Sequence, residues 1–310
     1  MPDDGRSFAT RPWFADRLAC PDCTVALALV DGAAEITCEQ CGRRFPIRNG
    51  QLHCVVDESV VATVHAPVRQ RDVAWPAWSE PPQGYAGPLR PRTNGRHLSV
   101  LANAARSLDV LDWGCGRAES RSLVADVLGH RYVGVDIAGD AADVIADVHR
   151  LPFAPGSFDH VITNATLEHV ANPFVAVAEI ARVLRTGGRF VGCVAFMEPH
   201  HCASRFHVTA DGIVHVLTSA GLVVDGIWPQ EGWTVFESLA SMPGPLSSPT
   251  RLVLRFLGLV EPLLRARHLH PREIRRHRWL QRKTPENVRR ERLFIAGQVD
   301  FLATKPALPA

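Results

Sequence analysis

The chain has 310 residues, of which 46% are hydrophobic and 21% charged, so it can bury one large core and a small additional domain. Its formal net charge of +2 argues neither for nor against a nucleic-acid partner. The first residues lack the pattern of a secretory signal, and the apolar run at 252–260 is far shorter than the roughly 20 residues needed to cross a bilayer. We therefore expect a cytoplasmic protein with no transmembrane segment.

Four of the eight cysteines form two closely spaced pairs. Cys20 and Cys23 make one Cys-x-x-Cys pair, and Cys38 and Cys41 make the second. Four thiolates at this spacing can enclose Zn²⁺ as a tetrahedron, and a full sulfur shell leaves no open position for catalysis. Metal ligation in a reducing compartment fits this pattern better than disulfides. The sequence therefore predicts a structural zinc ribbon over residues 13–57.

Residues 58–97 follow as a Pro-rich segment. Proline fixes φ and removes an amide donor, so long helices and sheets are not expected here. Trp75, Trp78 and Tyr85 give the segment apolar surface that it could bury over a pocket. We interpret 58–97 as a linker or a flap, and the choice between the two stays open.

From Leu98 onward, short β-rich runs alternate with helical stretches, which predicts an α/β fold with a mostly parallel sheet and helices on both faces. The expected strands are 110–112, 132–136, 143–147, 159–163, 189–195, 222–224 and 299–304. Asn172 as N-cap, Pro173 at the first helical position and Gly187 after the last turn predict the clearest helix.

The expected domain boundaries follow from these elements. A Rossmann-like domain covers 98–246, a basic helical insertion covers 247–298, and 299–306 returns to the sheet as its closing strand.

A glycine loop at 114–116 directly follows the first of these strands. Glycine permits a sharp turn and lets backbone amides approach a ligand closely. Asp136 ends the next strand, where a carboxylate can accept hydrogen bonds from both hydroxyls of a ribose. Asp147 closes the third strand and is placed to meet the amine of an adenine. Together with Asp112, these carboxylates predict one ligand crevice at the carboxyl edge of the sheet.

Six stretches resemble, in order and spacing, the motifs of class I S-adenosylmethionine-dependent methyltransferases of the type 11 family. They are 110–116, 133–136, 146–153, 157–159, 167–170 and 182–188. The resemblance spans about 108–195 and implies a Rossmann-like methyltransferase sheet whose last strand is antiparallel. A nicotinamide cofactor is the competing interpretation of the glycine loop, but the motifs after the fourth strand have no dehydrogenase counterpart.

The same resemblance implies how S-adenosylmethionine is bound. Glycines 114 and 116 surround its methionine part, Asp136 holds the ribose, Asp147 with Val148 reads the adenine, and Asn164 faces the amino group. The full set of expected cofactor-binding residues is Asp112, Gly114, Cys115, Gly116, Asp136, Ile137, Asp147, Val148 and Asn164. Ala118 stands where many relatives have a third glycine, and it is small enough that binding should survive.

The segment after the second cysteine pair, 42–50, resembles the ribbon of the tRNA methyltransferase activator family, which is also found fused to methyltransferases. Its basic residues Arg43, Arg44 and Arg48 are offset by nearby acidic residues. RNA binding requires a basic surface, so a packing or partner-docking role is favoured for the ribbon.

Methyl transfer from a sulfonium is an in-line displacement, in which the protein aligns the nucleophile and excludes water. A hydroxyl acceptor needs a base, and a histidine with a near-neutral pKa would serve. His169 follows the fourth strand, and His200 and His201 follow the fifth, at the edge where the acceptor should enter. We take these three as catalytic candidates; the alternatives are a pocket-shaping role for His169 and a solvated loop for the other two.

The sequence favours an enzyme that methylates a small-molecule acceptor of natural-product or glycan type, without nucleic acid as a partner. The alternative is an RNA methyltransferase that uses the ribbon and the basic C-terminal helices, but 164–167 lacks an Asn-Pro-Pro-Tyr-like tetrapeptide. A non-enzymatic protein with a relic cofactor fold is the third interpretation. The basic residues of the expected C-terminal helices are Arg272, Arg275, Arg276, Arg278, Arg282 and Lys283. The atom methylated and the oligomeric state stay open.

Overall fold

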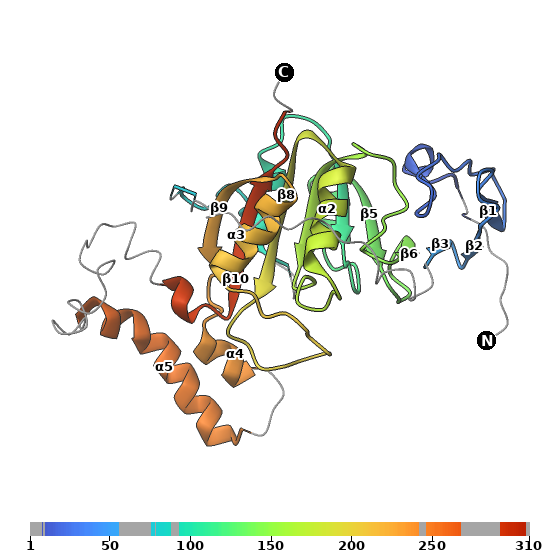
Figure 1. Ribbon diagram of the computed structural model, residues 1–310. Helices are drawn as coiled ribbons and strands as arrows, with labels where there is room; N and C mark the ends of the chain where they lie inside the picture. Colours follow the sequence, from blue (N-terminus) through green and yellow to red (C-terminus); the bar gives the residue numbers. More distant parts are fainter. Residues whose placement is uncertain are drawn as a thin grey trace.

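The computed structural model describes residues 8, 10–55, 76–77, 79–87, 93–241, 246–267 and 292–307. Within these ranges the strands are β1 (Glu35–Thr37), β2 (Arg44–Arg48), β3 (Gln51–Cys54), β4 (Asp109–Trp113), β5 (Arg131–Asp136), β6 (Val144–Ala146), β7 (Phe158–Asn164), β8 (Leu184–Ala195), β9 (Val223–Pro229) and β10 (Gln298–Thr304). They form one sheet in the order β1-β2-β3-β6-β5-β4-β7-β8-β10-β9 (Figure 1).

The centre of this sheet is parallel. From β4 the chain passes to β5 and β6 on one side and then returns to β7 and β8 on the other. The strand order therefore reverses between β4 and β7, and open α/β sheets bind ligands at the carboxyl ends of the strands beside such a switch point. The closing strand β10 is antiparallel to both of its neighbours, β8 and β9. The predicted fold class is confirmed.

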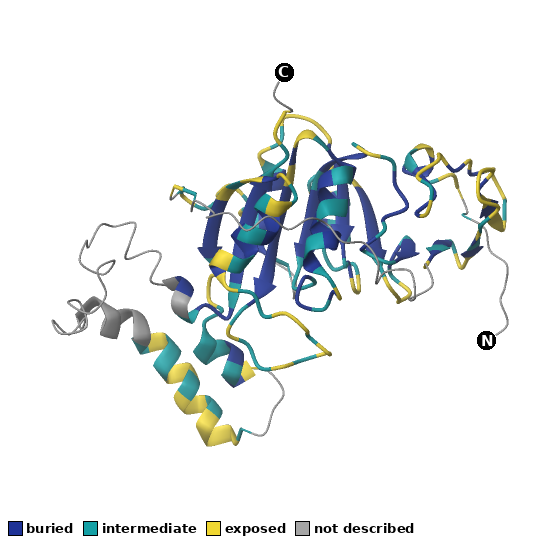
Figure 2. Ribbon diagram, viewed as in Figure 1, coloured by how far each residue is buried: buried dark blue, intermediate teal, exposed yellow. Residues whose placement is uncertain are grey.

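Alternate residues of the central strands enter two separate cores, as the pleat of a strand requires. Leu111 and Val133 pack into the larger core with α2 (Pro173–Val183) and α3 (Ala210–Ser219). Val110 and Tyr132 face the other way, toward α1 (Gly95–Ala102) and the short π-helix at 123–127. Figure 2 shows the central strands buried between these layers.

The predicted helix after β7 is present as α2. The side chain of Asn172 accepts hydrogen bonds from the Phe174 and Val175 amides, and Pro173 occupies the first turn. The helix ends earlier than predicted, because β8 begins directly at Leu184. Gly187, expected just after the helix, lies inside β8 with φ +76°, where its amide donates to the Lys305 carbonyl at 2.8 Å.

The N-terminal unit continues the sheet instead of standing apart from it. Strand β3 pairs in parallel with β6, with Leu52 opposite Val144. The Ala19 amide donates to the Pro152 carbonyl at 3.0 Å, and the Ala154 amide donates to the Arg17 carbonyl at 2.8 Å. Leu52 is fully buried in the larger core. Backbone pairing and apolar burial therefore join the two units into one structure.

Two further helices, α4 (Val235–Ser241) and α5 (Ser248–Arg267), lie between β9 and β10, as the predicted helical insertion requires (Figure 1). The basic residues expected to follow, from Arg272 to Lys283, lie outside the described residues. In the part of the chain that the structure describes, no helix combines the length and apolar character of a membrane span.

The described part of the Pro-rich segment packs against the far edge of the sheet. The indole of Trp228, itself buried, donates to the Ser79 carbonyl at 2.9 Å, and the Tyr85 amide donates to the Ser99 hydroxyl at 3.2 Å. Trp75 and Trp78 lie outside the described residues. Trp228 is thus a core residue.

A network of ion pairs lies at the amino ends of β4 and β7, opposite the predicted crevice. Asp109 pairs with Arg17 at 2.5 Å, and Arg185 bridges Asp109 at 2.9 Å and Asp159 at 2.7 Å. Burial alone would raise the pKa of Asp159, but hydrogen bonds from Arg106, the Asp109 amide and Arg185 outweigh it and hold that pKa well below its usual range. Because Arg17 belongs to the N-terminal unit, this network also joins the two units.

We expect Asp159→Asn to destabilise the protein by about 3 kcal/mol at neutral pH, since it leaves partners of a buried carboxylate uncompensated. The folded-state pKa is depressed, so this stabilisation is present above the ordinary aspartate pKa of about 3.9 and is lost as the pH falls through lower values. The difference in the free energy of unfolding between wild type and variant, measured in urea, should therefore become smaller as the pH is lowered below about 4. Asp126→Asn, at an exposed aspartate, is the control and should stay within about 0.5 kcal/mol of wild type. A gap that persists unchanged at low pH would contradict the assignment.

Candidate active site

The glycine loop lies against the end of the neighbouring strand. Both the Gly114 and Cys115 amides donate to the Val135 carbonyl, at 2.9 and 3.0 Å. Gly114 has φ +72° and Gly116 has φ +56°, a region that residues with a Cβ rarely occupy. A Cβ on Gly114 would lie 2.3 Å from the side chain of Thr166. The loop after β4, the end of β5 and the turn after β7 therefore converge at the switch point.

Asp136 is in direct contact with this loop. One carboxylate oxygen accepts from the Gly116 amide at 2.8 Å, and the other accepts from the Ile137 amide at 2.7 Å. Each oxygen keeps a second lone pair with which it can accept from a ligand hydroxyl. The structure therefore brings together two of the elements that the sequence predicted to share a ligand.

The side chains of Asp112 and Cys115 lie beneath the loop. The Asp112 carboxylate is buried and accepts from the Tyr132 hydroxyl at 2.7 Å, and burial raises its pKa to about 7. The Cys115 thiol packs with Ala142 and Ile145 in a small apolar cluster. The side chains of these two residues support the loop from inside the fold.

Asp147 belongs to a hydrogen-bonded chain that the sequence did not reveal. Its carboxylate accepts from the His149 amide at 2.9 Å and lies 2.6 Å from His149 Nδ1. His149 Nε2 accepts from the Asn172 amide at 3.0 Å, so the proton of the neutral ring is on Nδ1 and is donated to Asp147. Burial would raise the pKa of Asp147, but these hydrogen bonds lower it. The Asp-x-His spacing was the one available signal. Val148, between them, is half-buried against the larger core.

Asn164 ends β7 and is half-buried. Its side-chain oxygen accepts from the thiol of Cys193, on the adjacent strand β8, at 2.9 Å. The residue therefore stands at the carboxyl edge of the sheet, as predicted.

The turn after β7 and the long loop after β8 are held together. The Arg205 and Phe206 amides donate to the Glu168 carbonyl, at 2.5 and 3.0 Å, and the Arg205 guanidinium donates to the His169 carbonyl at 2.6 Å. The ring centroids of His169 and His201 lie 5.3 Å apart at an interplanar angle of 83°. The structure thus brings together two of the three candidate histidines, whereas His200 is exposed on the loop.

Burial, followed by the proximity of His201, lowers the pKa of His169. His169 is therefore neutral at pH 7, the form in which an imidazole nitrogen can accept a proton or bind a metal.

Glu168 is the residue of this region that sequence reasoning missed. Its side chain is 0% exposed, and among the described residues neither carboxylate oxygen has a partner in hydrogen-bonding geometry. Burial, reinforced by the nearby Glu198, raises the pKa of Glu168 to about 8, and the backbone amides of Glu168 and Ala195 only moderate this rise. In the sequence, Glu168 is one residue of the motif at 167–170, and no pattern there indicated that its side chain would be buried.

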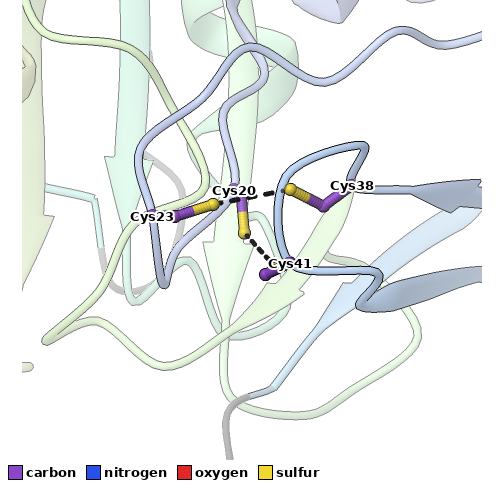
Figure 3. Close-up of side chains that lie close together, drawn as sticks. All are labelled: Cys20, Cys23, Cys38 and Cys41. Atoms are coloured by element: carbon purple, nitrogen blue, oxygen red, sulfur yellow. Dashed lines mark hydrogen bonds between the residues drawn. The ribbon is translucent and has the colours of Figure 1, made fainter.

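The four paired cysteines converge at one point, as Figure 3 shows. The Sγ atoms of Cys20 and Cys41 are 3.7 Å apart, and those of Cys23 and Cys38 are 3.5 Å apart. Zinc–sulfur bonds of about 2.3 Å at tetrahedral angles require sulfur atoms about 3.8 Å apart, so this donor set fits Zn²⁺. The backbone amide of Cys41 lowers the pKa of the Cys38 thiol to about 7, which favours the thiolate that binds metal.

Two family models match the chain. The methyltransferase domain model matches residues 111–192, and the Trm112p-like protein model matches residues 15–50. Both predicted resemblances are thereby confirmed, and the methyltransferase match covers the glycine loop, Asp136 and the turn that carries Glu168.

Among the similar proteins, the O-methyltransferase cnsE of Penicillium expansum is 28% identical over 158 residues, which are 42% of this chain and 57% of that protein. The demethylmenaquinone methyltransferase of Mycolicibacterium vanbaalenii is 40% identical over 92 residues, which are 27% of this chain and 40% of that protein. The chain thus spans less than two thirds of either relative.

A solved complex between the Haloferax volcanii Trm112 methyltransferase activator and a protein described as a methyltransferase contains a chain that is 19% identical. The match covers 70% of this chain and 90% of that chain, with a TM-score of 0.43.

Gly114→Ala tests the close approach of the glycine loop to the turn after β7. We expect a loss of about 1–2 kcal/mol from the left-handed backbone and a further ~1–3 kcal/mol from the clash with Thr166. Gly116→Ala is the matched control, because its φ is also positive but a Cβ there would meet nothing within 4 Å. Urea unfolding should show Gly114→Ala as the more destabilised variant, and equal losses would count against the described packing.

Cys38→Ser tests the metal centre. We expect the purified variant to contain one zinc equivalent less than wild type by atomic emission, and to melt at a lower temperature, because metal binding energy contributes to folding. Cys202→Ser, at an exposed cysteine outside the cluster, is the control and should keep the wild-type zinc content. An unchanged zinc content in Cys38→Ser would exclude the cluster as the zinc site.

Proposed function

We propose that this protein is an S-adenosylmethionine-dependent methyltransferase with its cofactor at the carboxyl ends of β4, β5 and β6. The hydrogen bond from the Gly116 amide to Asp136 is the observation that carries the proposal, because it joins a glycine turn and a ribose-binding carboxylate at the switch point of the sheet. The match of residues 111–192 to the methyltransferase domain family supports the same assignment.

In this proposal the cofactor-binding residues have separate tasks. Asp136 binds the ribose, and Asp147 with Val148 reads the adenine, while the exposed Ile137 covers it. Gly114 and Gly116 let the backbone approach the methionine part, which Asn164 contacts through its side-chain oxygen. Asp112 and Cys115 act from beneath, because their buried side chains hold the loop in shape.

The cofactor supplies a methyl group on a sulfonium sulfur, so the chain itself has only to orient the acceptor and exclude water. His169 and His201 are placed for this on the turn after β7 and the loop after β8, and His200 is on the solvent side of the same loop. We propose a small-molecule acceptor, of natural-product or glycan type, that is methylated at a hydroxyl. The similarity to the O-methyltransferase cnsE supports oxygen as the acceptor atom.

We propose a structural role for the zinc ribbon. Its strand β3 covers the edge of β6, and a full four-thiolate shell leaves the metal no open position. None of the eight cysteines is in a disulfide, and we propose a reducing compartment such as the cytoplasm.

The described residues do not favour the RNA alternative. The ribbon residue Arg43 is paired with Asp22, and Arg44 lies 3.8 Å from Glu35, so neither is a free cation for phosphate. The remaining argument for RNA concerns basic residues outside the described part of the chain.

Isothermal titration of S-adenosylmethionine into wild type and Asp136→Ala tests the proposal. A lost hydrogen bond to a charged group contributes about 1.5–3 kcal/mol, so the variant should bind about 10- to 150-fold more weakly. Asp140→Ala, at an exposed aspartate of the same edge, is the control and should bind as wild type does. If the titration of S-adenosylmethionine into folded wild type produces no binding heat, the enzyme assignment is refuted.

A further inference from the structure

A second cluster of ligating side chains lies at the acceptor side of the candidate active site. Glu168, His169 and His201 each offer a carboxylate oxygen or an imidazole nitrogen, and these three atoms all lie within 4.8 Å of one another. Glu168 and His169 come from the turn after β7, and His201 comes from the loop after β8. The cluster contains no cysteine, so its chemistry differs from that of the ribbon.

The free lone pairs of the two histidines follow from their hydrogen bonds. His201 Nδ1 lies 2.9 Å from the Pro199 carbonyl, which only accepts, so Nδ1 carries the proton and Nε2 keeps its lone pair. His169 Nδ1 is buried and has no partner among the described residues, so its lone pair is open to a metal ion when Nε2 carries the proton. A ligating histidine typically donates its other ring nitrogen to a backbone carbonyl in this way.

The enclosed carboxylate of Glu168 has no cationic partner among the described residues. Glu168 is fully buried, its oxygens lack partners within the described ranges, and Glu198 adds a second carboxylate nearby. Glu198 lies 3.7 Å from His201 Nδ1 and accepts from the indole of Trp233, so it is already engaged. No cation pairs with Glu168 among the described residues, and a bound metal ion would supply that partner.

We propose that Glu168, His169 and His201 bind one divalent transition-metal ion, such as Mn²⁺, Fe²⁺, Co²⁺ or Zn²⁺. Two imidazoles and one carboxylate suit this class of ion better than Mg²⁺ or Ca²⁺, which prefer oxygen ligands. Three protein ligands leave coordination positions open, unlike the four thiolates of the ribbon.

From its position, the ion would activate the acceptor for methyl transfer. This role rests on the proposed methyltransferase function. Thr166, two residues before Glu168, lies against Gly114 in the glycine loop, so the same turn serves both sites. An acceptor that ligates the ion through a hydroxyl would have the pKa of that hydroxyl lowered, as metal ions do for bound water. The acceptor class is then a hydroxyl-bearing small molecule that chelates a divalent metal. Its hydroxyl proton would pass to solvent water when the oxygen binds the ion, so no histidine is required as the base. The oxygen would then form a bond to the methyl carbon as the bond from that carbon to the sulfonium sulfur breaks.

Electron paramagnetic resonance of Mn²⁺ tests the site in the full-length protein with zinc already in the ribbon. Thiolates select Zn²⁺ over the harder Mn²⁺, so Mn²⁺ reports on the second site. Wild type should bind one Mn²⁺ per chain, and added Zn²⁺ should displace part of it. Glu168→Gln and His201→Ala should lose this binding, whereas His200→Ala, the exposed neighbour, should keep it. No uptake by wild type, or equal uptake by all four proteins, would overturn the proposal.

Titration of S-adenosylmethionine into the same samples separates the two proposals. Glu168→Gln keeps the shape of the side chain, so cofactor binding by this variant shows that its loss of Mn²⁺ is not a loss of fold. If wild type binds the cofactor but takes up no Mn²⁺, the metal site is refuted and the proposed function stands. If it takes up Mn²⁺ but binds no cofactor, the metal site stands and the methyltransferase assignment fails.

Discussion

The hydrogen bond between the Gly116 amide and Asp136 joins the two strands on which the candidate active site depends. It forms because β4 and β5 are parallel neighbours, so that their carboxyl ends meet at one edge. The Val135 carbonyl takes two further amides of the glycine loop, and Thr166 closes over Gly114 from the next strand. A loop held in this way exposes backbone to a ligand at little entropic cost on binding, which is the physical basis of preorganisation.

The N-terminal ribbon extends this arrangement instead of adding a separate module. Its strand β3 pairs with β6, which carries Ala146 next to the adenine-side residue Asp147. Arg17 of the N-terminal unit also pairs with Asp109 at the amino end of the central strand β4, so the unit is held by a second contact besides the pairing of β3 with β6. A metal ion held by the four cysteines would therefore order the ribbon and also the strand edge beside the proposed cofactor site.

The acceptor side is built differently, from a turn and a long loop instead of strand ends. Backbone amides of Arg205 and Phe206 bind the Glu168 carbonyl and hold the loop in place, while the Glu168 carboxylate is enclosed without a partner in the described structure. Buried ionisable groups of this kind concentrate at functional sites because they are costly elsewhere. The proposed cofactor site and the proposed metal site share the turn that begins after Asn164.

Local pattern alone determined much of this protein: the four paired cysteines, the glycine loop with Asp136, the succession of strands along the chain after Leu98, and the capped helix at Asn172. Each depends on spacing along the chain or on the alternation of apolar residues, which the sequence displays directly. The sequence did not reveal where α2 ends. The helix stops at Leu184 because β8 begins there and pairs with β7, a segment distant in the sequence. Packing between elements likewise decides three side-chain features. It buries Asp112, places His149 between Asp147 and the Asn172 amide, and encloses Glu168. Burial and hydrogen-bond partners are properties of the assembled fold, so only the tertiary structure could decide them.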